Sequence, residues 1–447
     1  MKRSLPTALK GCRKIGLVGL GISNRGVLAH LKECGECPEI RIREKKENGT
    51  DEESFLASID EDALVLSPSV RPDLPPIREA RARGVKILSD CEIFFRDTKA
   101  RCFAVTGSDG KSTTTAMLSL LLSAAMGTKI PAVGNIGQAL TPLLSEGAPA
   151  YAIELSSFQL FHYAPQCERA VITNLSENHL NWHTDMKEYA AAKAALYEKC
   201  RLPAVCIDDI GSFPLLKRAP FSVYSLSESE KTLAKCKSEF TYCIKNDTVY
   251  ENGKPLLPLN LLKADSRYNR YNLLAALALC AGLLTKDTAH AIENFVPLSH
   301  RCEPVGKVRG VTYLNSSIDS SPARTAQTLS SLHAPVILLL GGMGKGLSPA
   351  PLLSAVKEKC RAVIGFGPFG EEATAYLADG GYESILPPKK KMSDAFFSAI
   401  RKAKPGDTVL LSPGATSFDE FENFAARGEA FRRLVRSIQT LQGKDLP

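Results

Sequence analysis

The stretch "VTGSDGKSTTT" (residues 105–115) follows an apolar run and precedes a run with helical periodicity. A strand, a glycine turn and a helix in this order are typical of a phosphate-binding loop. A standard Walker A loop has a glycine five residues before its Gly-Lys pair, and Val105 occupies that place. The stretch therefore predicts a shortened phosphate-binding loop inside an α/β domain.

The shortened loop keeps the groups that bind phosphates. Backbone N–H groups of residues 108–112 can surround a triphosphate at a helix N-terminus, Lys111 can reach the outer phosphates, and Ser112 or Thr113 can hold Mg²⁺. An ordinary turn with a surface lysine is the alternative. The candidate nucleotide-binding residues of the loop are Gly107, Ser108, Asp109, Gly110, Lys111, Ser112 and Thr113.

The composition indicates a globular protein of two or three domains, since 44% of the 447 residues are hydrophobic and 23% are charged. A net charge of +8 without a long Lys/Arg tract favours an acidic small-molecule substrate over nucleic acid. Thirteen scattered cysteines predict no disulfide framework, and Cys34 and Cys37 lack a second pair for zinc. The sequence has no run of about 18 apolar residues that would predict a membrane span, so we expect a cytoplasmic protein.

Strand-like runs alternate with helix-like runs along the whole chain, which predicts parallel sheets covered by helices. We expect three α/β domains, at residues 1–97, 98–298 and 299–447. The first and third are predicted to be Rossmann-like and the central one a P-loop ATPase-type domain.

The first domain opens with "KIGLVGLGISNRG" (14–26), where Asn24 replaces the third glycine of the dinucleotide fingerprint. A complete NAD site and a turn that only needs glycine both stay possible, and the nucleotide portion of another ligand fits equally well.

Polar residues after two predicted strands of the central domain suggest a metal site. Glu154 ends the strand-like "YAIELSS" (151–157) and is a candidate Mg²⁺ ligand, although a salt-bridged structural carboxylate would also explain it. His179 and His183 follow the next strand-like run. They are either metal ligands or packed side chains.

Lys193 lies among small and apolar neighbours in "YAAAKAALY" (189–197). This setting predicts a shifted pKa or a modified amine, unless the side chain reaches solvent.

Together these motifs resemble the Mur ligases in order and spacing, from about Lys14 to Arg433, which is nearly the whole chain. The set is far more specific than any one of its members. The motifs are "VTGSDGKST", "GNIG", "IELSSFQL", "NLSENHLNWH" with "YAAAK", "YNRYNLLAALAL", "LSHRCEPV", "LLLGGMGKG" and "LLSPGATSFDEFENFAARGEAF".

The resemblance implies an ATP-dependent peptide-type ligase of peptidoglycan precursor synthesis, in which the short phosphate loop is normal. ATP would phosphorylate the carboxylate of UDP-N-acetylmuramoyl-L-alanine, and the amine of D-glutamate would attack the acyl phosphate. The stretch "SPGATSFDEF" (412–421), and the absence of a D-N-P-R-like tetrapeptide, favour glutamate as the amino acid. We expect these three small molecules as partners, no nucleic acid or membrane, and a monomer.

The same resemblance implies a role for particular residues. Two Mg²⁺ ions would be held by Ser112, Glu154, His179 and Lys193, with Lys193 carbamylated so that it offers oxygen ligands. Lys111, Glu154, His179 and Lys193 are the implied catalytic residues. The nucleotide would also contact Asn269, Asn272 and Arg301. Substrate contacts are implied for Ser67, Asn135, Ser320, Lys345, Ser417 and Phe424.

The chain departs from the family pattern where acids are expected. Ser316 replaces an aspartate that contacts ATP, and Asn178 and Asn181 replace the aspartates around His179. Asp319 is expected either to take over part of the missing contact or to cap the helix beginning near residue 322.

Three alternatives stay open. Another Mur-type ligase or a folylpolyglutamate synthase would share the central site. A P-loop nucleotide-binding switch is disfavoured, since no D-x-x-G or N-K-x-D motif follows the loop.

Overall fold

The chain folds into two compact units, Met1–Phe295 and Val296–Pro447. The computed structural model describes residues 3–35, 38–44, 56, 58–180, 182–209, 211–226, 233, 235–262, 265–296, 299–330, 332 and 335–440. Cys37 and Asn181 lie outside the described residues. Described strands form three sheets, of four, nine and six strands, so the predicted α/β class with parallel sheets is confirmed. The division into three domains stays a prediction, which the three sheets support.

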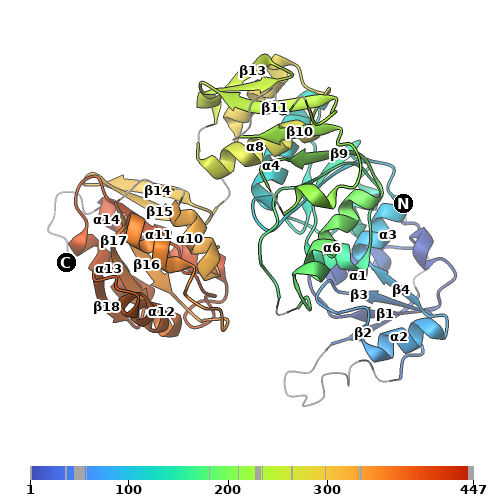
Figure 1. Cartoon of the computed structure of the whole chain (residues 1–447). Helices are drawn as coiled ribbons and strands as arrows, with labels where there is room; N and C mark the ends of the chain where they lie inside the picture. The colour runs from blue at the N-terminus through green and yellow to red at the C-terminus, as the bar shows by residue number, and fades with distance from the viewer. Residues whose placement is uncertain are drawn as a thin grey trace. The chain divides into compact units, whose positions relative to one another are not determined.

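The first sheet is parallel throughout, with strand order β2-β1-β3-β4. Figure 1 shows α2 on one side of this sheet and α1 and α3 on the other. Its strands are β1 (Lys14–Val18), β2 (Glu39–Arg43), β3 (Ala63–Leu66) and β4 (Lys86–Ser89). Its helices are η1 (Thr7–Leu9), α1 (Ile22–Lys32), α2 (Pro75–Ala82) and α3 (Asp90–Asp97).

The broken glycine pattern of the first turn has a structural reason. Asn24 is fully buried, and its side-chain amide donates to the carbonyl oxygens of Val18, Gly19 and Val65 at 3.1, 2.8 and 3.0 Å. The amide thus ties the turn to two strands, a function that a glycine could not perform. A Cβ on Gly26 would lie 2.3 Å from that of Ala139, so this glycine permits close packing of α1.

The nine-stranded sheet has the order β13-β12-β11-β10-β9-β8-β5-β7-β6. Strands β5 to β11 run parallel, and β12 and β13 add an antiparallel edge. The strands are β5 (Arg101–Thr106), β6 (Ala132–Gly134), β7 (Ala150–Glu154), β8 (Cys167–Ile172), β9 (Cys200–Cys206), β10 (Ser222–Ser225), β11 (Phe240–Lys245), β12 (Thr248–Glu251) and β13 (Lys254–Pro258).

Helices cover both faces of this sheet, and two hydrophobic clusters lie beneath them. Helix α8 is buried from Asn272 to Leu279 because it packs on the strands and on α4, as Figure 1 shows. The helices are α4 (Lys111–Met126), η3 (Thr141–Ser145), α5 (Ser157–His162), α6 (Met186–Glu198), η4 (Phe213–Leu215), η5 (Leu259–Leu261), α8 (Arg267–Leu279), α9 (Lys286–Ala289) and η6 (His290–Asn294). No helix among the described residues is long and apolar enough to span a bilayer.

The second unit holds a six-stranded sheet of order β14-β15-β19-β16-β17-β18, parallel except for β14. Helices α13 and α14 cover one face, and α10, α11 and α12 cover the other (Figure 1). The strands are β14 (Glu303–Val308), β15 (Val311–Asn315), β16 (Val336–Gly341), β17 (Cys360–Phe366), β18 (Ile385–Lys389) and β19 (Thr408–Leu411). The helices are α10 (Pro322–Ser330), α11 (Leu352–Lys359), α12 (Gly367–Asp379), α13 (Met392–Lys402) and α14 (Phe424–Thr440).

One buried arginine joins the strand ends of this second unit. The fully buried guanidinium of Arg427 donates to the carbonyl oxygens of Ser317, Ala415 and Thr416 at 2.9, 3.0 and 2.9 Å. Burial lowers the pKa of Arg427 to about 10, so the side chain stays protonated at neutral pH. Arg427 therefore holds the loops after β15 and β19 together.

Replacing Arg427 with methionine should destabilise the second unit by about 2–4 kcal/mol, because buried carbonyl groups lose a charged donor. Arg433→Met, on the exposed side of the same helix, is the matched control and should change the free energy of unfolding by less than about 0.5 kcal/mol. Urea denaturation of both full-length variants measures the effect. Equal stabilities would show that Arg427 does not hold the loops.

Candidate active site

The predicted phosphate loop connects β5 to α4, at the edge of the sheet where the parallel strands end. Gly110 precedes the helix with a left-handed φ of 80°, and a Cβ there would lie 2.3 Å from Asn272 Oδ1. Gly107 has a φ of 149°, and a Cβ there would lie 1.9 Å from Thr173 Oγ1. Both positions therefore require glycine.

The loop is fastened to the segment that follows β8. The Ser108 hydroxyl is buried, donates to the Ser176 carbonyl at 2.9 Å, and lies 2.9 Å from the Tyr189 hydroxyl. The Asp109 N–H donates to Asn174 Oδ1 at 3.0 Å. These bonds hold the loop against the segment after β8 and against α6.

Two lysine amines bind the same carbonyl oxygen in this loop. Lys111 Nζ lies 2.9 Å from the Gly107 carbonyl oxygen, and Lys193 Nζ lies 2.7 Å from it. Lys111 Nζ also donates to the Ser108 carbonyl at 2.9 Å. Helix α6 carries Lys193 into this position. One carbonyl oxygen is a poor partner for two full charges, so one amine is expected to lose its proton more readily.

Lys193 is that amine. Its side chain is 1% exposed and lies over the Tyr189 ring, 4.6 Å from the ring centre. Burial lowers the pKa of Lys193 well below its ordinary value, and the charge of Lys111 lowers it further. The carboxylates of Asp109 and Glu154 only partly oppose this shift. The shifted pKa predicted from the sequence is thus supported, and a side chain that reaches solvent is excluded.

Glu154 ends β7 next to the phosphate loop, paired in register with Val105. It is 1% exposed, and Asn135 binds it twice, through Nδ2 to Oε1 at 2.7 Å and through N–H to the backbone carbonyl at 2.9 Å. Oε2 is buried, and no described residue donates a hydrogen bond to it. No described cation pairs with Glu154, so the salt-bridge alternative fails among these residues. A buried carboxylate oxygen in this state suits a metal ion.

The two candidate histidines have different surroundings. His183 is 1% exposed, and its ring nitrogens lie 3.0 Å from Ser157 Oγ and 3.3 Å from Glu188 Oε2. Burial lowers the pKa of His183, so the packed side chain is the better explanation for it. His179 is exposed, has a left-handed φ of 57°, and lies 4.9 Å from the Phe158 ring. Of the two, His179 is the one placed to meet a ligand.

No group of three His, Cys, Asp or Glu side chains that could hold a metal ion occurs in the described part of the chain. The oxygen donors near the loop include Glu154 and the half-buried Ser112 in the first turn of α4. Such a set fits Mg²⁺, which commonly keeps waters and takes substrate phosphates as ligands instead of an all-protein cage.

The predicted asparagine contacts are beside the loop. Asn272 Oδ1 accepts a hydrogen bond from Thr114 Oγ1 at 3.2 Å, and its Nδ2 donates to Asn269 Oδ1 at 3.2 Å. Asn269 lies in the first turn of α8, where its N–H is capped by Ser266. The structure thus brings Asn269 and Asn272 to the N-terminus of α4.

In the first sheet, Ser67 directly follows β3 and is buried against the glycine turn. A Cβ on Gly19 or Gly21 would lie 3.1 or 3.4 Å from atoms of the Ser67 side chain. Glu44 accepts a hydrogen bond from the Leu20 N–H at 3.1 Å. Ser67, a predicted substrate contact, and Glu44 therefore border one glycine turn.

The remaining candidates belong to the second unit and are positioned by strand ends. Lys345, after β16, donates from Nζ to Ser320 Oγ at 3.4 Å. Ser417, after β19, is buried, and Phe424 is 41% exposed at the start of α14. Arg301 precedes β14 in the same unit. Lys345 and Ser320 are thus brought together.

Asp319 has a role that the sequence did not suggest. It is buried and accepts hydrogen bonds from Ser412 Oγ at 2.7 Å and Thr328 Oγ1 at 2.8 Å. The ATP contact and the helix cap expected for Asp319 stay predictions. The carboxylate joins the end of β19 to α10. Ser316 is also buried, and its hydroxyl accepts from the Cys302 N–H at 3.1 Å.

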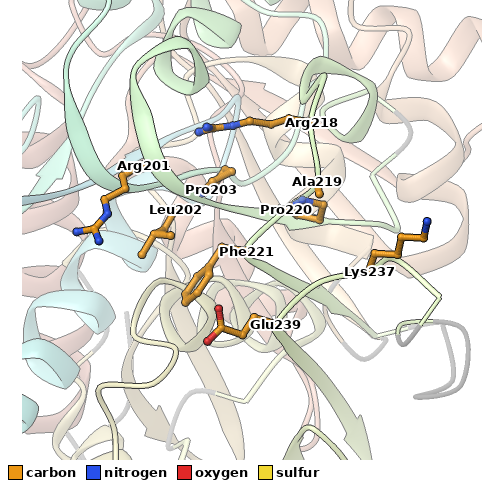
Figure 2. Close-up of a pocket in the computed structure, with 9 residues that line it drawn as sticks. All are labelled: Arg201, Leu202, Pro203, Arg218, Ala219, Pro220, Phe221, Lys237 and Glu239. Carbon is orange, nitrogen blue, oxygen red and sulfur yellow. The ribbon is translucent and has the colours of Figure 1, made fainter.

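One surface pocket lies at the opposite edge of the nine-stranded sheet, where β9, β10 and β11 begin. Figure 2 shows the Lys237 side chain extending away from those of Arg201 and Arg218. The lining residues are Arg201, Leu202, Pro203, Arg218, Ala219, Pro220, Phe221, Lys237 and Glu239.

Comparisons with known proteins agree with this geometry. The Mur ligase middle domain family matches residues 105–280. A UDP-N-acetylmuramoylalanine–D-glutamate ligase of Symbiobacterium thermophilum is 32% identical over 95% of this chain and 98% of its own length. This chain belongs to the Mur ligase family. A ligase of the same name from Clostridium botulinum is 32% identical over 95% of this chain and 97% of its own length.

Solved structures show the same fold as this Mur ligase. UDP-N-acetylmuramate-alanine ligase MurC from Thermotoga maritima is 19% identical, with a TM-score of 0.58 over 96% of this chain and 99% of its own. A pseudomurein peptide ligase type C from Methanothermus fervidus is 15% identical, with a TM-score of 0.59 over 95% of this chain and 100% of its own. Family membership excludes a P-loop nucleotide-binding switch. Mur ligases depend on ATP and Mg²⁺.

Gly110→Ala should weaken ATP binding about tenfold or more, because the added Cβ displaces the Asn272 amide. A tenfold loss of affinity equals about 1.4 kcal/mol of binding free energy. Gly127→Ala is the matched control, since Gly127 follows the other end of α4 with a φ of 64° and nothing within 4 Å. It should lower stability by about 1–2 kcal/mol and leave ATP affinity unchanged. Calorimetric titration with ATP compares the two, and equal affinities would contradict the assigned contact.

Proposed function

We propose that this Mur ligase joins D-glutamate to UDP-N-acetylmuramoyl-L-alanine at the expense of ATP, in peptidoglycan precursor synthesis. The names of the relatives support these substrates. The chemistry rests chiefly on one observation, the convergence of Lys111 and Lys193 on the Gly107 carbonyl. A monomeric state and a cytoplasmic location stay predictions.

The phosphate loop would hold the triphosphate of ATP. Its N–H groups at residues 108–112 lie at the N-terminus of α4, where the helix favours an anion. Lys111 Nζ would exchange its bonds to loop carbonyls for bonds to the outer phosphates. Asn269 and Asn272 would support the nucleotide beside the loop, and the family resemblance implies Arg301 as a further nucleotide contact.

The donors near the loop fit two Mg²⁺ ions. Bound Mg²⁺ neutralises charge on the phosphates and on the reacting carboxylate. Glu154 would offer Oε2 to one ion, and Ser112 its hydroxyl. His179 and a carbamylated Lys193 would offer ligands to the other.

Lys193 is suited to carbamylation by its burial. A neutral amine can attack carbon dioxide, forming a new N–C bond and releasing one proton from nitrogen, so that the product is a carbamate anion. The lowered pKa of Lys193 favours the neutral amine. The change would replace an amine with two oxygen donors, which Mg²⁺ prefers.

The other candidates would hold the two joined substrates. Ser67 would contact the UDP end of the sugar nucleotide, and Asn135 its peptide end, beside Glu154. In the second unit, Lys345 and Ser417 would bind the carboxylates of D-glutamate. Ser320 and Phe424 would complete this site. The acyl phosphate formed from the alanine carboxylate would then be attacked by the amine of D-glutamate, with release of phosphate.

Phosphate release with UDP-N-acetylmuramoyl-L-alanine and ATP tests the proposal, with D-glutamate, L-glutamate and a diamino acid supplied in turn. D-Glutamate should give the highest kcat/KM. Lys111→Ala should lower kcat by about 100-fold or more, since the charge on the transferred phosphoryl group loses its partner.

Lys129→Ala, an exposed lysine beyond the other end of α4, should be as active as the unaltered enzyme. Near-normal turnover of Lys111→Ala would refute the assigned role of the loop. Faster turnover with a diamino acid would refute the assigned amino acid.

A further inference from the structure

A set of contacts outside the phosphate site joins the first sheet to the nine-stranded sheet within the first unit. Arg71 follows β3 and donates from Nη2 to Glu188 Oε1 at 2.8 Å and from Nη1 to the Trp182 carbonyl at 2.9 Å. Trp182 in turn donates from Nε1 to the Ser69 carbonyl at 2.8 Å. We call Ser69, Arg71, Trp182 and Glu188 the clamp.

Neighbouring rings and a bidentate ion pair restrict the side chains of the clamp. Arg71 and Glu188 are about one-fifth exposed, and the guanidinium lies over the rings of Phe161 and Trp182 at 4.8 and 5.0 Å. A second bond, from Arg71 Nη1 to Glu188 Oε2 at 3.0 Å, makes the ion pair bidentate. Hydrogen bonding to Arg71 lowers the pKa of Glu188 to about 2, so this carboxylate stays charged at neutral pH.

The first end of the clamp reaches the predicted sugar-nucleotide site. Ser67 Oγ lies 3.4 Å from Ser69 Oγ, and the carbonyl of Ser69 is the one that Trp182 binds. Residues 67–71 are therefore one short segment, with the substrate candidate at its beginning and Arg71 at its end.

The second end reaches the metal and phosphate candidates. Glu188 lies on α6, which also carries Lys193, and its Oε2 is 3.3 Å from His183 Nδ1. His183 Nε2 is 3.0 Å from Ser157 Oγ, three residues beyond Glu154. Trp182 is also three residues beyond His179. Glu154 is thus linked to the clamp only indirectly, through Ser157 and His183. His179 is linked directly, since its carbonyl accepts a hydrogen bond from the N–H of Trp182 at 3.0 Å.

We propose that Arg71 is a positioning residue, which couples occupation of the sugar-nucleotide turn at Ser67 to the placement of His179 and Lys193 at the phosphate loop. This inference rests on the proposed function. A shift of residues 67–71 when the sugar nucleotide binds would be passed through the bidentate pair to α6. Because coupling between two sites is reciprocal, the sugar nucleotide should then raise the affinity for ATP, and ATP that for the sugar nucleotide.

The test measures binding of a non-hydrolysable ATP analogue with Mg²⁺ by calorimetry, with and without saturating UDP-N-acetylmuramoyl-L-alanine. In the unaltered enzyme the sugar nucleotide should tighten analogue binding about fivefold or more. Arg71→Met keeps the volume over the two rings and removes the ion pair. It should abolish this enhancement and leave analogue affinity without the sugar nucleotide unchanged.

Two further variants separate coupling from folding. Glu188→Gln breaks the same pair from the other side and should also abolish the enhancement. Asp73→Asn is the matched control, because Asp73 is the other carboxylate partner of Arg71, at 2.7 Å, but belongs to the same loop. It should keep the enhancement. Arg71→Lys, which keeps the charge but not the bidentate geometry, should restore part of it.

Trp182, the only tryptophan of the chain, provides an independent signal. Its emission should change when UDP-N-acetylmuramoyl-L-alanine binds the unaltered enzyme, because its Nε1 is bonded to the Ser69 carbonyl in the segment that holds Ser67. Full enhancement in both Arg71→Met and Glu188→Gln would overturn the proposal and leave the proposed function standing. Failure of the unaltered enzyme to bind the sugar nucleotide at all would overturn both.

Discussion

The geometry of the candidate site depends on one carbonyl oxygen, that of Gly107, which accepts hydrogen bonds from both Lys111 and Lys193. Lys111 begins α4 and Lys193 comes from the middle of α6, so this oxygen ties two helices to the phosphate loop. Burial and the charge of Lys111 both disfavour the protonated form of Lys193. The contact thus determines both where the second amine lies and which chemistry it can perform.

The arrangement of the sheets explains why the other candidates gather around this contact. Strands β5, β7 and β8 are parallel neighbours, so the loop after β5, Glu154 after β7 and His179 after β8 all lie at the same edge. Helix α8 adds Asn272 from the side, close enough that Gly110 cannot carry a Cβ. In the second unit, Arg427 gathers strand-end loops in the same way, by donating to their carbonyls.

Local sequence patterns were sufficient to predict the α/β class, the phosphate loop and the burial of Glu154, because glycine turns, strand runs and misplaced charges are visible over a few residues. Contacts between distant residues could not be predicted. Asn24 looked like a defect in a glycine pattern but ties a turn to two strands. Asp319 looked available to a nucleotide but is bound by Ser412, 93 residues away. Arg71 was missed because its partner Glu188 is 117 residues away, although the single tryptophan beside it was a signal.

The most direct test of the account is a carbon-13 NMR spectrum of the enzyme in labelled bicarbonate with Mg²⁺. The account predicts one carbamate resonance in the unaltered enzyme, absent from Lys193→Met. The resonance should weaken as the pH falls, because added protons convert the carbamate back to carbon dioxide and amine, and the protonated amine cannot attack carbon dioxide again. A spectrum of the unaltered enzyme without this resonance at neutral pH, or one that persists in Lys193→Met, would contradict the account.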